Sequence, residues 1–191
     1  MTAWRWRNSK SGYGLIAIAA HWLTVAAILV LYPLGLYIVS LTYYDPAYRI
    51  VPHWHKSLGI LLVIGVLLRL LWRLANRRPR DLPEHKPWER RLAHTVHGLL
   101  YALLLIVPVT GYLISTADGR PVSVFGWFEV PALITDLVRN QEDVAGVWHF
   151  WLATALVTLV GLHALGALKH HFIDRDSTLK RMIQPTKEPS S

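Results

Sequence analysis

Several histidines lie inside the long hydrophobic stretches of this sequence, and four of them lie at spacings that predict two pairs. His149 and His163 are 14 residues apart, which in a helix places them about 21 Å apart on nearly one face. His21 lies early in the first hydrophobic stretch, and His55 lies at the start of the second. If neighbouring stretches are antiparallel helices, His163 meets His21 at one depth and His149 meets His55 at another. An ionisable side chain at such a position is costly, so each histidine is a candidate functional residue.

Paired imidazoles suit one kind of chemistry well. A porphyrin leaves two axial positions open on its iron, and two opposed histidines fill both of them. Such an iron exchanges single electrons and does not readily bind oxygen. We therefore expect two b haems, one held by His21 and His163 and the other by His55 and His149, which together form a conducting path.

Three further roles for these histidines stay open. A single intramembrane histidine can simply hydrogen-bond a neighbouring helix. A transporter or proton relay without haem also uses such residues, although histidines paired by depth do not form a continuous chain. A structural or biogenesis role is the third. Zinc or copper without porphyrin is disfavoured, because two histidines are too few and the acidic residues lie in the connections.

The composition supports histidine as the metal ligand. The chain has ten histidines and no cysteine, which excludes disulfides, iron–sulfur clusters, thiolate-bound zinc and covalent haem attachment. The 20 Lys and Arg residues lie outside the long apolar stretches or near their ends. A nucleic-acid-binding protein would spread them over a polar surface, so we expect no nucleic-acid partner.

The elements that must position the histidines are four apolar segments, at about 13–40, 51–74, 92–115 and 146–170. Each is long enough to cross a bilayer, and each should be a helix because backbone groups in lipid must pair internally. We predict an all-α, integral membrane, up-and-down four-helix bundle, a single domain over 1–191 with two haems in the bundle core. The connection 116–145 is expected to cap the periplasmic face.

The distribution of cations predicts the orientation of the bundle. Sixteen of the Lys and Arg residues lie in the N-terminal arm, the connection between the second and third segments and the C-terminal region. The other side has only Arg49, Lys56, Arg120 and Arg139. Because cytoplasmic flanks retain positive charge, we expect both termini in the cytoplasm and a multi-pass protein of the bacterial inner membrane.

Further side chains near the cytoplasmic side are candidates to contact haem. Arg69 and Arg73 are one turn apart and could pair with propionates, or extend to lipid phosphate. His97 could hydrogen-bond a propionate or replace His21 as a ligand. His94, on the same face, is better explained by an interhelical hydrogen bond, and His53 by an interfacial position.

The sequence resembles the bacterial di-haem cytochrome b561 family, in particular a branch whose genes often accompany a periplasmic lipid-binding protein. The resemblance covers nearly the whole chain. It rests on SGYGLIAIAAHWLT, on the region from LTYYDPAYR to HKSLGILL, on GYLISTADGRPVSVFGWFEVPA and on ALKHHFIDRDSTLKRM. The family's axial ligands fall on His21, His55, His149 and His163.

The resemblance implies electron exchange between a membrane quinone, such as ubiquinone, and a periplasmic redox partner. Relatives are also linked to superoxide oxidation coupled to quinone reduction. His170 and Lys169, beside His171, are candidates to dock a quinone head, or they form a basic lipid contact. Lys56 is a candidate entry for an anion such as superoxide, or it extends into the lipid interface. Direction of electron flow is left open.

Overall fold

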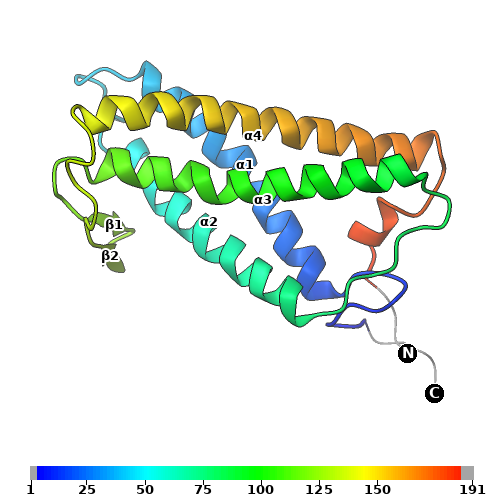
Figure 1. The fold of residues 1–191 in the computed structure, drawn as a ribbon. Helices are drawn as coiled ribbons and strands as arrows, with labels where there is room; N and C mark the ends of the chain where they lie inside the picture. The colour runs from blue at the N-terminus through cyan, green and yellow to red at the C-terminus, as the bar shows by residue number, and fades with distance from the viewer. Residues whose placement is uncertain (1–3, 186–191) are drawn as a thin grey trace. The chain divides into compact units, whose positions relative to one another are not determined.

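The computed structural model describes residues 4–185 and contains four long helices, a hairpin and a short 3-10 helix (Figure 1). Lys187, one of the cations counted above, lies outside the described residues. The helices are α1 (Leu15–Ser40), α2 (Ile50–Ala75), α3 (Pro87–Ser115) and α4 (Gln141–Phe172). The remaining elements are β1 (Val122–Val124), β2 (Phe128–Val130) and η1 (Lys180–Met182).

All four long helices have the length and apolar composition needed to cross a membrane, so the predicted all-α, four-helix membrane fold is confirmed. Helix α3 begins at Pro87, earlier than residue 92. Proline suits the first turn because its missing N–H would have no helical partner. The backbone N–H of Lys86 donates to Oε2 of Glu89 at 2.9 Å, which caps this end.

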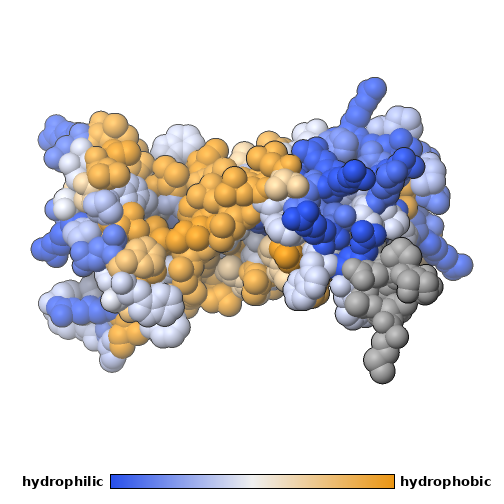
Figure 2. Space-filling model, turned by 90° about the horizontal axis from the view of Figure 1, so that it is seen from below, coloured by the Kyte–Doolittle hydropathy of each residue, from blue (hydrophilic) through white to orange (hydrophobic). Residues whose placement is uncertain are grey.

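The helices expose large hydrophobic side chains. Leu23 in α1 is 71% exposed and Leu74 in α2 is 77% exposed, and Figure 2 shows extensive hydrophobic surface over the helices. A soluble helix buries one apolar stripe and exposes a polar face, whereas a helix that is apolar on every side belongs in lipid. The surface of these helices is therefore suited to the bilayer.

The chain divides into two compact units. Unit 1 contains the described parts of Met1–Thr24, Gly65–Leu100 and Thr158–Ser191, and unit 2 contains Val25–Ile64 and Tyr101–Val157. Each long helix contributes one segment to each unit.

A hairpin in unit 2 forms part of the connection between α3 and α4 (Figure 1). Strands β1 and β2 pair antiparallel, with Val122 opposite Val130. The turn has positive φ at both Phe125 (50°) and Gly126 (72°), which is the requirement of a type I′ turn. The hydroxyl of Ser57, fully buried on α2, accepts the N–H of Phe125 at 3.0 Å and fixes the hairpin to that helix.

The rest of this connection is also held by polar side chains of unit 2. The hydroxyl of Tyr112 donates to the carbonyl of Pro131 at 2.7 Å and accepts the N–H of Leu133 at 2.7 Å. Gln141, at the start of α4, donates to the carbonyl of Leu113 at 2.9 Å. The sequence predicted a capping connection here, but it did not predict the two strands.

In unit 1, hydrogen bonds fasten the segment after α4 to other parts of the unit. Nε1 of Trp22 donates to the carbonyl of Met182 in η1 at 2.7 Å. The guanidinium of Arg181 donates to the carbonyl of Arg80 at 2.8 Å. These contacts place η1 beside α1 and beside the connection that precedes α3.

Candidate functional sites

Unit 2 contains one pair of facing histidines. His55 on α2 and His149 on α4 have ring centroids 6.1 Å apart, with the ring planes at 77°. A metal–imidazole bond is about 2 Å long, so two imidazoles on opposite sides of one ion have centroids roughly 6 Å apart. The observed spacing suits a single metal ion between these rings.

Hydrogen bonding fixes which nitrogen of His149 can bind a metal. Its Nδ1 lies 3.0 Å from the carbonyl oxygen of Val107 and 3.1 Å from the hydroxyl oxygen of Thr110. Because a carbonyl can only accept, Nδ1 carries the proton and donates it. Nε2 then has the free lone pair, the arrangement common among metal-binding histidines.

Two glycines make room beside these rings. A Cβ atom at Gly111 on α3 would lie 3.0 Å from Cε1 of His149, and one at Gly35 on α1 would lie 3.3 Å from Cε1 of His55. Nδ1 of His55 is buried, and no hydrogen bond of good geometry reaches it among the described residues. The pair therefore sits in space that a larger side chain would fill, and Nε2 of His149 is available to a ligand.

Unit 1 contains the second pair. His21 on α1 and His163 on α4 have centroids 6.4 Å apart and ring planes at 68°, again close to the spacing for two imidazoles on one ion. His97 on α3 is nearer to His163, with centroids 5.1 Å apart. Three histidines from three helices thus meet in this unit.

An arginine completes the polar contacts of this group. Nη2 of Arg69 on α2 lies 2.9 Å from Nδ1 of His21. Arginine has no acceptor, so in this contact Nδ1 of His21 accepts the hydrogen bond. Arg73, one turn later, is half-buried.

The remaining candidates of the spans lie at exposed positions. His53 and Lys56 on α2 and His94 on α3 are exposed. The ring of His53 contacts Phe125 of the hairpin turn, with centroids 6.0 Å apart. His53 therefore lies beside the hairpin turn.

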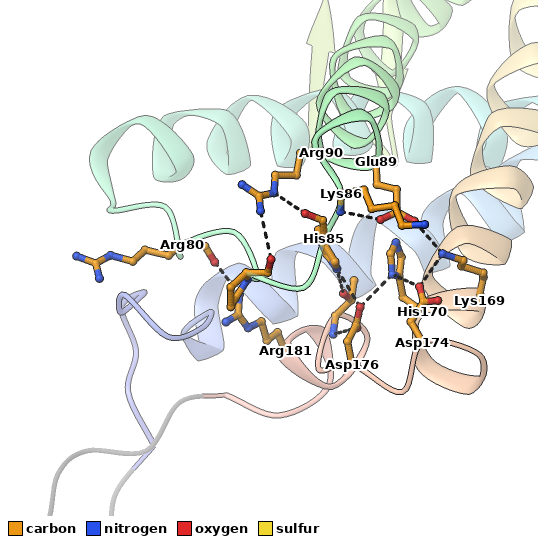
Figure 3. Close-up of polar contacts among 12 residues, drawn as sticks. Arg80, His85, Lys86, Glu89, Arg90, Lys169, His170, Asp174, Asp176 and Arg181 are labelled. Atoms are coloured by element: carbon orange, nitrogen blue, oxygen red, sulfur yellow. Dashed lines mark hydrogen bonds and ion pairs between the residues drawn. The ribbon is translucent and has the colours of Figure 1, made fainter.

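Lys169 and His170, the predicted quinone contacts, both face carboxylates (Figure 3). Nζ of Lys169 lies 2.8 Å from Glu89 and 2.7 Å from Asp174. Nδ1 of His170 lies 2.8 Å from Asp174 and 3.0 Å from Asp176. The sequence identified the basic members of this group but not their acidic partners.

Asp176 is the most enclosed carboxylate of the group, with 6% of its side chain exposed. Burial raises its pKa, but hydrogen bonds from the hydroxyl and N–H of Thr178 and from His85, together with attraction to His170, outweigh burial and lower the pKa to about 2. Asp176 is therefore an anion at neutral pH.

Comparison with known proteins decides the family. The model of prokaryotic cytochrome b561 matches residues 12–185. Cytochrome b561 homolog 2 of Escherichia coli (strain K12) is 49% identical over 176 residues, which cover 92% of this chain and 93% of the relative. The chain belongs to the prokaryotic cytochrome b561 family.

Two more distant relatives also match nearly end to end. Probable superoxide oxidase CybB of Yersinia pestis is 28% identical over 172 residues, covering 90% of this chain and 95% of the relative. Cytochrome b562 of Cereibacter sphaeroides is 28% identical over 185 residues, covering 93% of this chain and 99% of the relative. Each name is that of the relative and not of this chain.

Family membership and the four membrane helices confirm a bacterial multi-pass membrane protein that transfers electrons. The family also implies haem b. The residues present fit that group, since each unit offers two imidazoles at metal-bridging separation from opposite helices. The glycines beside His55 and His149 leave space for a bulky group.

Sequence reasoning missed His85 and Asp176 as members of a site. Nε2 of His85 lies 2.9 Å from Oδ2 of Asp176, although the two residues are 91 positions apart in sequence. The run KHHFIDRD, with acidic residues four and six positions after His170, was the local pattern that could have indicated this cluster.

Proposed function

We propose that this protein binds two b haems, one between His55 and His149 in unit 2 and one between His21 and His163 in unit 1. We propose that it exchanges electrons between a membrane quinone and a redox partner on the periplasmic side. The observation that supports this most is the matched separation of the ring centroids, 6.1 and 6.4 Å.

Distances favour His21 over His97 as the partner of His163. The centroids of His97 and His163 are 5.1 Å apart, less than the roughly 6 Å that two rings on either side of one ion require. His97 is instead placed beside the pair, where its ring can hydrogen-bond a propionate. Arg69 and Arg73, on α2, are the proposed cationic partners of the propionates.

Haem held by these histidine pairs would supply single-electron transfer. The chain supplies the ligands and their orientation. The carbonyl of Val107 holds the ring of His149 by accepting from its Nδ1, so Nε2 stays available. All four histidine side chains are partly buried.

Quinone docking at Lys169 and His170 is part of this proposal, but carboxylates already contact both residues. A quinone oxygen would compete with Glu89 and Asp174 for the N–H donors of Lys169, and with Asp174 and Asp176 for Nδ1 of His170. The adjacent cavity of about 250 Å³ is lined only by charged residues and a histidine, whereas sites for aromatic rings are mostly apolar.

A second candidate function is superoxide oxidation coupled to quinone reduction. The Yersinia pestis relative is named as a probable superoxide oxidase. Lys56, exposed and next to His55 on α2, offers a cation for an approaching anion. A periplasmic lipid-binding protein is another proposed partner, and the hairpin connection is where we expect contact.

The visible spectrum tests haem binding. We expect a sharp reduced α-band, two haems per chain by pyridine haemochrome, and loss of about one haem in each of His21→Ala and His55→Ala. The exposed His53→Ala, two residues from His55, is the matched control and should keep both haems. Both haems retained in His21→Ala or in His55→Ala would refute that assignment, and a colourless protein would favour a haem-free transporter or relay.

Reduction kinetics separate the candidate donors. If quinol is a partner, it should reduce the haems, and His170→Ala should slow this reduction without changing the spectrum. The control is His171→Ala, the next residue on α4. Reduction by superoxide that weakens in Lys56→Ala would support the oxidase, whereas equal rates would reject Lys56 as the entry.

A further inference from the structure

Beyond electron transfer, we propose that His85, His170 and Asp176 form a binding site for a divalent transition-metal ion. We call these three residues the His85 triad. It lies in unit 1, between the connection that precedes α3, the last turn of α4 and the segment that follows α4 (Figure 3). It does not include any of the proposed haem ligands.

The geometry of the triad is close to that of a metal site. Nε2 of His85, Nδ1 of His170 and Oδ2 of Asp176 all lie within 4.8 Å of one another. Oδ2 of Asp176 is 2.9 Å from His85 and 3.0 Å from His170. Ligands about 2 Å from a tetrahedral ion are roughly 3.3 Å apart, so small outward shifts would admit the ion.

The hydrogen bonding of the triad also points to a cation. Nδ1 of His170 is buried, and it makes no hydrogen bond of good geometry among the described residues. Yet carboxylate oxygens of Asp174 and Asp176 lie 2.8 and 3.0 Å from it. A ring nitrogen carries at most one proton, which these two carboxylate oxygens would have to share. A shared metal ion would satisfy this crowded arrangement.

A second set of possible ligands nearby is less suitable. Glu89, His170 and Asp174 also bring three ligand atoms within 4.8 Å. However, Nζ of Lys169 already pairs with Glu89 at 2.8 Å and with Asp174 at 2.7 Å. The ammonium group of Lys169 already neutralises these carboxylates, and it would repel a metal ion bound between them. The ion pairs of Asp176 within the described chain are with His85 and His170.

The ligand types select the class of metal. Two imidazoles and one carboxylate suit zinc and neighbouring transition metals, whereas calcium and magnesium prefer oxygen ligands. The cavity of about 250 Å³ is lined by His85 and Asp176, so water can reach a fourth coordination position. With 18% of each histidine side chain exposed and 6% of the aspartate, the triad is enclosed but reachable.

A metal here would join two regions that are far apart in sequence. His85 belongs to the connection before α3, while His170 and Asp176 bracket the end of α4. Because the ion binds only the folded arrangement, it should raise the midpoint of thermal unfolding. At a hundredfold excess over Kd the expected increase is about 5–10 °C.

The test uses the full-length, haem-loaded protein in detergent, without a polyhistidine tag and after removal of metals with EDTA. Titration with Zn²⁺ against a zinc-sensitive dye should show one tight site per chain. His85→Ala and Asp176→Asn should weaken that site at least tenfold with the haem spectrum unchanged. His171→Ala is the matched control, because its ring packs on Phe172 and belongs to neither ligand set, and it should bind zinc like the wild type.

A measurement on the wild type avoids dependence on the variants. Zn²⁺ should protect His85 and His170 from diethyl pyrocarbonate, read by mass spectrometry, but should leave the exposed His53 reactive. No stoichiometric zinc binding, binding that survives in both triad variants, or equal reaction of His85 with and without zinc would each overturn the proposal.

Discussion

Nη2 of Arg69 lies 2.9 Å from Nδ1 of His21, on two different helices of unit 1. This contact requires Nδ1 to accept a hydrogen bond. A neutral imidazole that binds iron through Nε2 carries its proton on Nδ1 and donates from it. The two arrangements exclude each other. Iron binding by Nε2 of His21 should therefore release Arg69, whose forked guanidinium is suited to a carboxylate such as a propionate.

Removing this guanidinium should change one redox potential. A cation near the iron favours the reduced form, so Arg69→Ala should lower the midpoint potential of the unit 1 haem by an amount on the order of tens of millivolts. Arg69→Lys keeps the charge and should show a smaller decrease. Spectroelectrochemical titration measures both, with the unit 2 haem as internal reference. An unchanged potential in Arg69→Ala would contradict a role beside the haem.

The glycines of unit 2 predict a graded series of variants. Gly111→Ala places a Cβ 3.0 Å from Cε1 of His149, and Gly35→Ala places one 3.3 Å from Cε1 of His55. We expect the first to shift the His149 ring and weaken haem retention most, and the second to have a smaller effect. Haemochrome content after extended dialysis, together with the EPR signal of the ferric haem, measures this.

Gly59→Ala is the matched control for that series. Its Cβ would have no neighbour within 4 Å, and alanine is the better helix former by about 1 kcal/mol. This variant should keep its haem and be slightly more stable. If all three variants behaved alike, the proposed crowding at His149 would be wrong.

The fold was accessible from the sequence because its determinants are local. Long apolar segments predict spanning helices without knowledge of their partners, and the four helices are confirmed. The first residues of α3 and α4 were harder to predict from the sequence. Residues 87–91 are mostly charged or polar, which lowers the mean hydropathy of this stretch but does not prevent a helix. Glu89 caps the helix there, so α3 extends beyond the apolar segment.

The parts that sequence could not provide depend on contacts between distant residues. Helical phase predicted that His163 would meet His21, and the two rings are adjacent in the structure. No short pattern connects Arg69 to His21 or His85 to Asp176, since helix packing and loop paths determine these pairs. The hairpin was missed because Phe125, a bulky residue, adopts a positive φ that usually favours glycine.

Ser57 should be important for holding that hairpin. Its side chain is fully buried and accepts the N–H of Phe125 at 3.0 Å. Ser57→Ala leaves this N–H without its partner, at a cost of roughly 1–3 kcal/mol. We expect faster amide exchange across 122–130 and a lower midpoint of thermal unfolding. Ser40→Ala is the control, because Ser40 is exposed and its hydroxyl donates to the nearby carbonyl of Tyr37. Equal exchange in both variants would contradict this role.

The orientation proposed from the cation distribution can be tested with little background, because the chain has no cysteine. Arg120, with 84% of its side chain exposed, lies in the connection between α3 and α4, and Lys180 begins η1. Retention of positive charge in the cytoplasm places Arg120 outside and Lys180 inside. Arg120→Cys should therefore react with a membrane-impermeant maleimide in intact cells, and Lys180→Cys only after lysis. The reverse pattern would show that the cation excess does not set the topology of this protein, and would move the His55 and His149 pair to the cytoplasmic side.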